Sequence, residues 1–448
     1  MIQNLFTARS NYNWTMFHVI LGVVCSFNKW MLIPWFYIVI LSSFNLILSN
    51  LLIHNSIKSF IPFIIYLCSF EVFGRMLNLS PFIPWELSKY LIITASALII
   101  FTGRCEKPFF RGIVILIFLI PGSVIDESNK VSVASIISNL LGPISMALFL
   151  IILGRYKIKY NEFDSILRLI WYPSISMLVY LMLKTPEYSK INFGLQANFL
   201  TSGDFGPNQV ATILGLGMFL SFYAWMNKLL FSGNHNLDGI FIGLFAYQGF
   251  LSFSRGGMYI AILSIPLYYI VFRRSVTFKD VIKIRGLRPL LFFIFAILIL
   301  FSSFSIIQSL TEGNLGLRYI GETNSTIIGE KTKTINTMTT GRFEIFIEDL
   351  ILWDKYIIFG TGVGASRYLR GKGLDGISPH TEISRLLAEH GIFGLFILVT
   401  ILSCYLSMIR KNKDNLYKSI QVVLFFIGMG TTMHSAMRTF VTPILVGL

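Results

Sequence analysis

Two short arginine motifs stand where an anion could bind. SFSRGG (252–257) places Arg255 between two apolar runs. An arginine near a bilayer is costly unless it is paired or hydrated, and a guanidinium can hold a phosphate through two hydrogen bonds. TTGRFE (339–344) contains Arg342 just after Thr340, a plausible helix cap. The alternatives are a snorkelling arginine at a helix end for Arg255, and a solvated arginine paired with a nearby glutamate for Arg342.

The residues after Arg342 predict an amphipathic helix. Phe343, Phe346, Ile347 and Leu350 follow the spacing i, i+3, i+4, i+7 and would form one apolar face. Arg342 would then lie in the first turn, where a cation opposes the helix dipole. That position makes sense if an anion is shared by the guanidinium and the free amides of this turn.

A histidine follows in SPHTE (378–382). Ser378 is expected to cap a helix whose first residue is Pro379 and which ends at Gly391. His380 would lie in the first turn, where the positive helix end favours the neutral imidazole. It could act as a base or donate a hydrogen bond to an oxyanion. The alternative is an exposed histidine without a chemical role.

A further polar segment, GDFGPNQ (203–209), opens an apolar run. Asn208 could simply cap that helix. Alternatively, Asn208 and Asp204 place an amide and a carboxylate at a pocket. The residue types leave the catalytic base open among four candidates: Asp204, Glu344, Glu382 and His380.

The elements that must position these residues are apolar helices. The chain has 448 residues, of which 54% are hydrophobic and 13% charged, with a mean hydropathy of +0.69. Soluble proteins carry about 25% charged residues. This composition excludes an ordinary cytosolic enzyme, a disordered chain and a fibrous repeat. It predicts an all-α, polytopic transmembrane helical bundle of about 12–13 spans. The apolar runs are 14–27, 31–53, 57–74, 87–102, 112–126, 131–153, 166–184, 210–226, 239–254, 256–272, 290–310, 392–409 and 420–436.

The basic residues predict the orientation of the bundle. The net charge is +15, and the basic side chains cluster in short loops that fall on one side of the predicted spans. The positive-inside rule makes this side cytoplasmic, so we expect a membrane protein that binds no nucleic acid. The opposite side receives 185–209 and one large outer loop, which we expect to contain short helices. The predicted divisions are 1–202 (N-terminal helices), 203–310 (central helices with the Asn and Arg motifs), 311–391 (the large loop) and 392–448 (C-terminal helices).

Several chemistries have no motif in this sequence. GxxxxGK[ST], HExxH, CxxC and GxSxG are absent. We therefore expect no cofactor, no bound metal, no ATP site and no serine-hydrolase nucleophile.

Taken together, the motifs resemble those of the O-antigen ligase/polymerase superfamily of membrane glycosyltransferases. The shared features, in order, are FGPNQVA, SFSRGG, GRFEIF, GTGVG and PHTEISRLLAEHGIFGLF, all within 203–400. The N-terminal helices match only in general character. Thr381 departs from the pattern, because members of the superfamily often have asparagine after the histidine.

The resemblance implies a donor and a site. The donor would be an oligosaccharide linked to a polyprenyl (undecaprenyl) diphosphate, transferred without a metal to a glycan acceptor. The site would face the periplasm or outside of the cytoplasmic (inner) membrane. Arg255 and Arg342 would bind the diphosphate, and His380 would engage the acceptor or the leaving group. The further residues expected at the substrate are Asn208, Asp204, Arg318, Glu344 and Glu382.

The expected function is a polymerase that joins lipid-linked repeat units of an O-antigen, capsule or exopolysaccharide. A chain-length regulator or a flippase could be its partner. The alternative within the superfamily is a ligase that moves the glycan to lipid A core or to protein. The alternatives of other classes are a lipid-linked sugar transporter, which would favour charged groups near the middle of the membrane, and a scaffold subunit.

Overall fold

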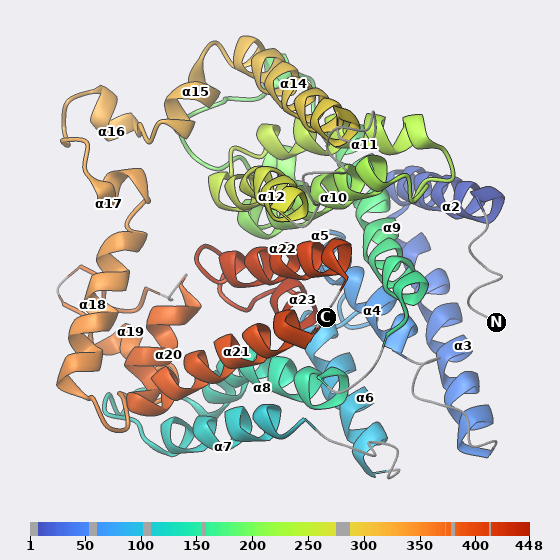
Figure 1. Ribbon diagram of the computed structural model, residues 1–448. Coiled ribbons are helices and arrows are strands. Elements are labelled where there is room, and N and C mark those ends of the chain that lie inside the picture. The colour runs from blue at the N-terminus through green and yellow to red at the C-terminus, as the bar shows by residue number, and fades with distance from the viewer. Residues whose placement is uncertain are drawn as a thin grey trace. The chain divides into compact units, whose positions relative to one another are not determined.

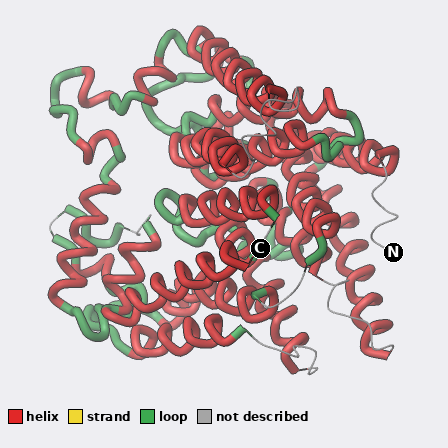
Figure 2. Tube along the Cα trace, in the orientation of Figure 1, coloured by secondary structure: helices red, strands yellow, loops and turns green. Residues whose placement is uncertain are grey.

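The structure, a computed structural model, is built of helices and loops (Figure 1). It describes residues 8–52, 61–101, 109–154, 158–274, 287–371, 373–377, 381–411 and 414–448. Figure 2 shows helix and loop but no strand over these residues, which confirms the predicted all-α class.

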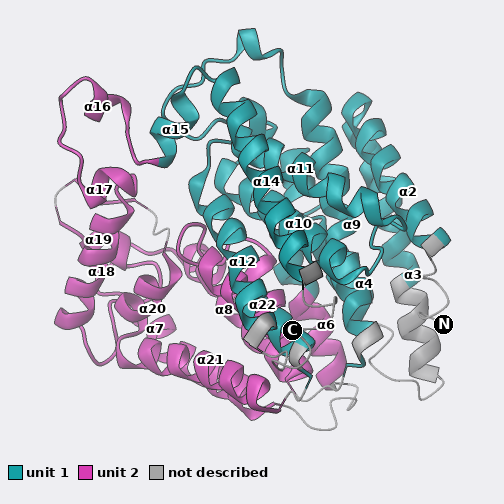
Figure 3. Cartoon of the chain, turned by 45° about the horizontal axis from the view of Figure 1, so that its top comes forward, with its two compact units in different colours: residues 1–91, 157–319, 414–423 teal, residues 92–156, 320–413, 424–448 magenta. Residues whose placement is uncertain are grey.

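The chain forms two compact units, each assembled from separate stretches of sequence (Figure 3). Unit 1 comprises 1–91, 157–319 and 414–423, and unit 2 comprises 92–156, 320–413 and 424–448. The division predicted from the sequence follows the order of the chain and stays a prediction.

Unit 1 contains most of the long helices before the large loop. Its helices are α2 (Ala8–Phe27), α3 (Leu32–Leu52), α4 (Ile61–Ser69), α5 (Glu71–Met76), the start of α6 (Leu87–Phe101), α9 (Tyr160–Lys184), α10 (Pro207–Asn227), α11 (His235–Leu251), α12 (Arg255–Arg274), α14 (Leu287–Leu310), α15 (Asn314–Tyr319) and the start of α22 (Asn415–Thr431). Short 3-10 turns, η1 (Lys29–Met31), η3 (Tyr188–Lys190) and η4 (Leu200–Ser202), lie between them.

Unit 2 combines long apolar helices with the short helices expected in the large loop. Its helices are the rest of α6, α7 (Phe110–Val124), α8 (Val133–Leu153), α16 (Asn324–Ile327), α17 (Ile335–Met338), α18 (Arg342–Lys355), α19 (Ser366–Leu369), α20 (Glu382–His390), α21 (Ile392–Lys411), the rest of α22 and α23 (Val441–Gly447). Its core joins α20 to the apolar helices through Ile115, Leu119, Met146, Ala147, Leu150, Leu386, Ile397, Ile401, Met437 and Val446.

Six helices among the described residues are long and apolar enough to cross a membrane, which is typical of a polytopic membrane protein. They are Val133–Leu153, Glu162–Lys184, Pro207–Asn227, Arg255–Phe272, Pro289–Leu310 and Ile392–Lys411. Shorter apolar helices cover Lys29–Ser42, Leu87–Ile100, Phe110–Val124 and Leu416–Thr431.

One predicted span is divided. The run 57–74 was expected to form a single helix, but α4 ends at Ser69 and α5 begins at Glu71. Glu71 and Arg75 of α5 are both buried and form an ion pair. The run therefore breaks at Phe70, and the helix that follows it carries a buried charge pair.

Loops that are distant in sequence meet at one end of unit 1. A nitrogen of the Arg75 guanidinium, Nη1, lies 2.9 Å from the side-chain oxygen of Gln209 at the start of α10. The amide of Asn198 donates to the carbonyl of Ser252, between α11 and α12, at 2.9 Å. These contacts gather three segments that are far apart in the sequence around the beginnings of α10 and α12.

Candidate functional site

Two helices of unit 1 begin side by side at this end. Pro207 is the first residue of α10 and Gly206 caps it, so the predicted cap, Asn208, is instead the second helical residue. The Asn208 side chain accepts a hydrogen bond from the hydroxyl of Ser254 at 2.8 Å. Because Ser254 directly precedes Arg255, Asn208 links the start of α10 to the start of α12.

Arg255 is the first residue of α12 and is half-buried. Its guanidinium donates to the carbonyl of Arg318 in α15 at 3.0 Å. One turn later, the hydroxyl of Tyr259 donates to the carbonyl of Tyr319 at 2.5 Å. Within the described part of the chain, no carboxylate pairs with Arg255. The structure therefore brings Arg255 and Arg318, both predicted site residues, to one place and leaves donors of Arg255 available.

The glycines of SFSRGG serve helix packing at Gly257. A Cβ there would lie 2.5 Å from the backbone nitrogen of Thr212 in α10. A Cβ on Gly215 would in turn lie 2.9 Å from the Gly257 carbonyl. These contacts hold α10 and α12 close together, so the helix contact explains Gly257 without a ligand.

Asp204 lies in the segment that leads into α10. Its side chain is exposed, its φ is +54°, and its amide donates to the carbonyl of Phe199 at 2.9 Å. Among the residues that the structure describes, Asp204 forms no ion pair. A role as base or ligand stays a prediction.

In unit 2, Arg342 is the first residue of α18 and is half-buried, as the motif predicted. The predicted cap is wrong, because Gly341 caps the helix and not Thr340. Both residues have a positive φ, +55° at Thr340 and +80° at Gly341. The amide of Gly341 donates back to the carbonyl of Asn336 at 2.9 Å, so these two residues close α17 before α18 begins.

The first amides of α18 already have partners. The amide of Phe343 donates to the hydroxyl of Thr339 at 3.1 Å, and that of Glu344 donates to the side chain of Asn336 at 3.1 Å. The exposed Glu344 carboxylate accepts a hydrogen bond from the same Asn336 amide group at 2.7 Å. These two amides are therefore not free in this structure, and an anion shared between this turn and Arg342 stays a prediction.

The buried face of α18 differs from the predicted one. Ile345, Asp349 and Leu352 are buried, whereas Phe343 is 40% and Ile347 39% exposed. The apolar spacing located apolar side chains correctly. It did not identify the buried face, which includes the Asp349 carboxylate.

Asp349 accepts three hydrogen bonds from two other segments of unit 2. Two come from the guanidinium of Arg370, at 2.9 and 2.7 Å, and one comes from the hydroxyl of Ser384 in α20, at 2.8 Å. Ser384 also bonds Thr381 at 2.5 Å. Burial raises the pKa of Asp349, and Arg370 and Ser384 partly offset that rise. This cluster ties the helix that begins with Arg342 to the start of α20.

α20 begins later than predicted. Its first residue is Glu382, and Thr381 is in the capping position. The amide of Glu382 donates to the carbonyl of Thr432 at 2.8 Å. The predicted cap and first residue, Ser378 and Pro379, lie outside the described residues, as does His380. The predicted end at Gly391 is confirmed.

Glu382, predicted to contact substrate, is buried. It pairs with Arg385 and accepts a hydrogen bond from the amide of Met437 at 3.4 Å. Arg385 also donates to the side chain of Asn139 at 2.7 Å. These contacts hold Glu382 in the packing of unit 2, and its contact with substrate stays a prediction.

The glycines of GTGVG (360–364) form a tight backbone contact. A Cβ on Gly362, where φ is +94°, would lie 1.9 Å from the carbonyl oxygen of Ile125 at the end of α7. The amide of Thr361 donates to the carbonyl of Ala388 at 2.8 Å. The motif thus fits between the ends of α7 and α20.

Two titratable groups end α20. Burial raises the pKa of Glu389 to about 7, and Arg385 and a backbone hydrogen bond partly offset that rise. Burial lowers the pKa of His390 to about 3, with a smaller effect of Arg385. Near neutral pH His390 is therefore uncharged, and Glu389 is partly protonated.

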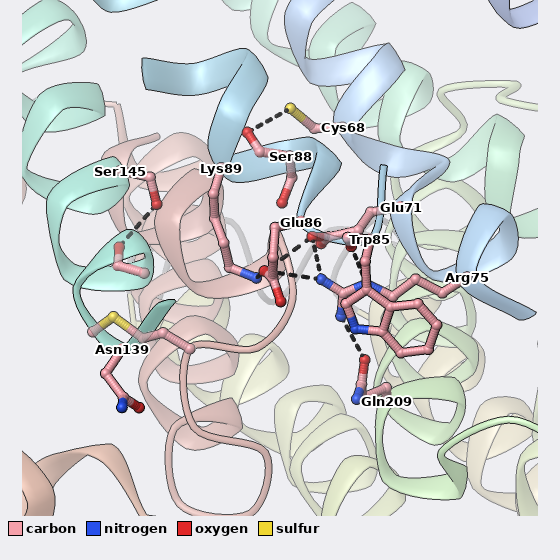
Figure 4. A network of polar contacts seen from close by, with 12 residues as sticks. Cys68, Glu71, Arg75, Trp85, Glu86, Ser88, Lys89, Asn139, Ser145 and Gln209 are labelled. Atoms are coloured by element: carbon pink, nitrogen blue, oxygen red, sulfur yellow. Dashed lines mark hydrogen bonds and ion pairs between the residues drawn. The ribbon is translucent and has the colours of Figure 1, made fainter. Parts of the chain in front are cut away.

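The sequence reasoning missed four charged residues near the α10 start. Glu71, Arg75, Glu86 and Lys89 form one network in unit 1, which Figure 4 shows beside Gln209. The sequence signal that could have revealed this network was the pair of charges, Glu71 and Arg75, at the edge of the apolar run 57–74.

Arg255 belongs to unit 1 and Arg342 to unit 2. Their predicted meeting over one diphosphate stays a prediction. Among the described residues, no group of three or more His, Cys, Asp or Glu side chains could hold a metal ion.

Comparison with protein-family models, curated proteins and solved structures finds no match to this chain.

Proposed function

We propose that this chain is a membrane glycosyltransferase that polymerises lipid-linked oligosaccharide repeats on the outer side of the cytoplasmic membrane. The donor would be a polyprenyl diphosphate-linked oligosaccharide, and the acceptor a second lipid-linked glycan. The bundle would cross the membrane about 12–13 times. The six long apolar helices and the resemblance in motifs support this proposal.

The single observation that carries the proposal is the environment of Arg255. Its guanidinium donates one hydrogen bond to the Arg318 carbonyl and pairs with no described carboxylate. Among the described residues the Arg255 guanidinium has a neutral carbonyl as its hydrogen-bond partner, so its positive charge is left without an opposite charge, which favours a bound anion. A diphosphate headgroup has the geometry and charge to fill that role.

The chemistry follows from charge development. As the bond from the sugar to the diphosphate breaks, the leaving diphosphate gains negative charge. A fixed cation or donor aimed at that charge stabilises the transition state by about 3 kcal/mol, or roughly a hundredfold in rate. In this proposal Arg255 supplies one such cation and Arg342 a second, while His380 engages the acceptor or the leaving group. Asp349 would hold α18 and the start of α20 in fixed positions relative to each other.

The test is chain assembly in cells with single substitutions. Arg255→Ala and Arg342→Ala should each abolish long glycan chains while the protein still inserts in the membrane. Lys190→Ala is the matched control, because Lys190 is an exposed cation whose pair with Glu187 is also exposed. Normal chain-length ladders from both arginine variants would refute the proposal.

The same assays separate the alternatives. Loss of a polymerase leaves single repeats attached to their final acceptor, whereas loss of a ligase leaves polymer on the carrier lipid. Purified protein that joins lipid-linked oligosaccharides without any gradient would exclude a transporter. Unchanged activity in His380→Ala would instead favour a scaffold role for the segment that contains this histidine.

A further inference from the structure

Four charged side chains form a network of ion pairs within unit 1. Nη2 of Arg75 lies 2.7 Å from Glu71 and 3.2 Å from Glu86, and Nζ of Lys89 lies 3.5 Å from Glu71 and also bonds Glu86. The side chains of Glu71, Arg75 and Lys89 are at most 3% exposed, whereas that of Glu86 is 27% exposed. Two carboxylates thus balance two cations.

Such a network is a poor way to gain stability. Taking charges out of water costs several kcal/mol per ion, and well-packed apolar side chains often replace a buried ion pair without loss. Ionisable groups buried among membrane helices are for the same reason associated with function. The network therefore calls for a role beyond packing.

Its contacts lead to the start of α10. Besides its two carboxylate partners, Arg75 donates through Nε to the carbonyl of Trp85 and through Nη1 to Gln209 at 2.9 Å, as Figure 4 shows. The ring of Trp85 packs edge-on against Phe205, with centroids 5.5 Å apart. Arg75 thus fixes both the first turn of α10 and the loop before it.

The next residues complete a chain of contacts to the anion site. Gln209 directly follows Asn208, which accepts from Ser254, the residue before Arg255. A shift of the α10 start would therefore move the hydrogen bond that holds the start of α12. Arg75 is thus linked to Arg255 by two hydrogen bonds and by two pairs of residues that are neighbours in the sequence.

We propose that Arg75 is a positioning residue that, through Gln209, holds the start of α10 so that Asn208 and Ser254 present Arg255 to the diphosphate of the donor. This inference rests on the proposed function. The charges of Glu71, Glu86 and Lys89 fix Arg75 itself, and Gln209 transmits its position.

The experiment compares substitutions on both sides of the contact between Arg75 and Gln209. Gln209→Met removes the acceptor for Arg75 but leaves all four ion pairs, so it should fold. Gln209→Glu keeps an acceptor oxygen. Arg75→Lys keeps the positive charge and loses the reach of the guanidinium.

Arg168→Lys is the matched control, because Arg168 is also buried and donates to Asn11 at 3.1 Å. Asn11 in turn bonds the carbonyl of Leu230, just past the other end of α10. A general effect of altering a buried arginine in unit 1 would therefore appear in this variant too.

Each protein is placed in lipid nanodiscs. Turnover is measured with the polyprenyl diphosphate-linked oligosaccharide that accumulates in a strain lacking this protein, and Tm is measured in parallel. Gln209→Met and Arg75→Lys should lower kcat at least tenfold with less than a threefold change in KM. This split is expected because the additional negative charge on the leaving diphosphate develops only in the transition state. Gln209→Glu and Arg168→Lys should stay within threefold of the wild type.

The double variant Arg75→Lys/Gln209→Met should be no more than about twofold slower than the slower single variant, because both break the same contact. Three results would overturn the inference. The effects of the two substitutions on kcat could multiply in the double variant, or the loss of kcat could follow the loss of Tm across all variants. Arg168→Lys could also lose as much kcat as the other two single variants. Wild-type protein without turnover would overturn the proposed function and this inference together. An active wild type with unaffected Gln209→Met and Arg75→Lys would overturn the inference alone.

Discussion

Removing the carboxylate of Asp349 should destabilise unit 2 more than any surface change. The side chains of Asp349 and Arg370 are both fully buried, and their nearest atoms are 2.7 Å apart. Asp349→Leu would leave the Arg370 guanidinium buried without its anion, and Ser384 would lose its acceptor. Breaking a buried ion pair in this way costs about 3–5 kcal/mol. For a cooperative unit of fewer than 200 residues this corresponds to a fall of roughly 6–20 °C in Tm.

The assay is thermal unfolding of the purified protein in nanodiscs. Glu187→Gln is the control, because the pair that Glu187 forms with Lys190 is 74% and 69% exposed and should contribute less than about 1 kcal/mol. The double variant Asp349→Leu/Arg370→Met should recover much of the lost stability, because it removes both charges at once. A fall no larger than that of Glu187→Gln, or a double variant no better than Asp349→Leu, would refute the reasoning.

Two further substitutions test the packing of each unit. Glu389→Gln removes a carboxyl whose pKa burial raises from 4.5 to about 7. The native state holds this proton more tightly than the unfolded state, so wild-type stability relative to Glu389→Gln should fall by about 3 kcal/mol as pH rises from 4.5 to 7 and then level off. The measurement is thermal unfolding of both proteins between pH 5 and 8. A difference in stability that does not change with pH would contradict the prediction. Gly257→Ala should lower Tm by an amount equivalent to about 1–3 kcal/mol, since its Cβ would meet the Thr212 backbone. Gly194→Ala, with no atom within 4 Å of its Cβ, is the control, and equal Tm losses would contradict the packing argument.

Local sequence was sufficient to place most helices. Among the described residues, the predicted apolar runs lie on helices. The backbone of an apolar segment that is removed from water must form its own hydrogen bonds, and an α-helix forms them within the segment. Arg342 was expected in the first turn of a helix and lies there, and Arg255, expected between two apolar runs, is the first residue of α12. The break between α4 and α5 was missed, because a window of mostly apolar residues hides two charges that pair with each other.

Helix caps were harder to predict than helices. Thr340, Asn208 and Ser378 were all chosen as caps by residue type. At two of these positions glycine caps the helix instead, and the Asn208 side chain accepts from the hydroxyl of Ser254, the residue before α12. The order of residues does not reveal such a partner, which lies 46 residues away along the chain.

The sequence by itself determined the helical class, the apolar character of the chain, the position of Arg255 between two apolar runs and that of Arg342 at the beginning of α18. These depend on residues that are neighbours along the chain. Only the tertiary structure decided that Asp349 faces Arg370 and that Arg75 reaches Gln209, 134 residues away. Burying a charge is favourable only when an opposite charge or a hydrogen-bond partner is in place, and packing between distant helices supplies that partner.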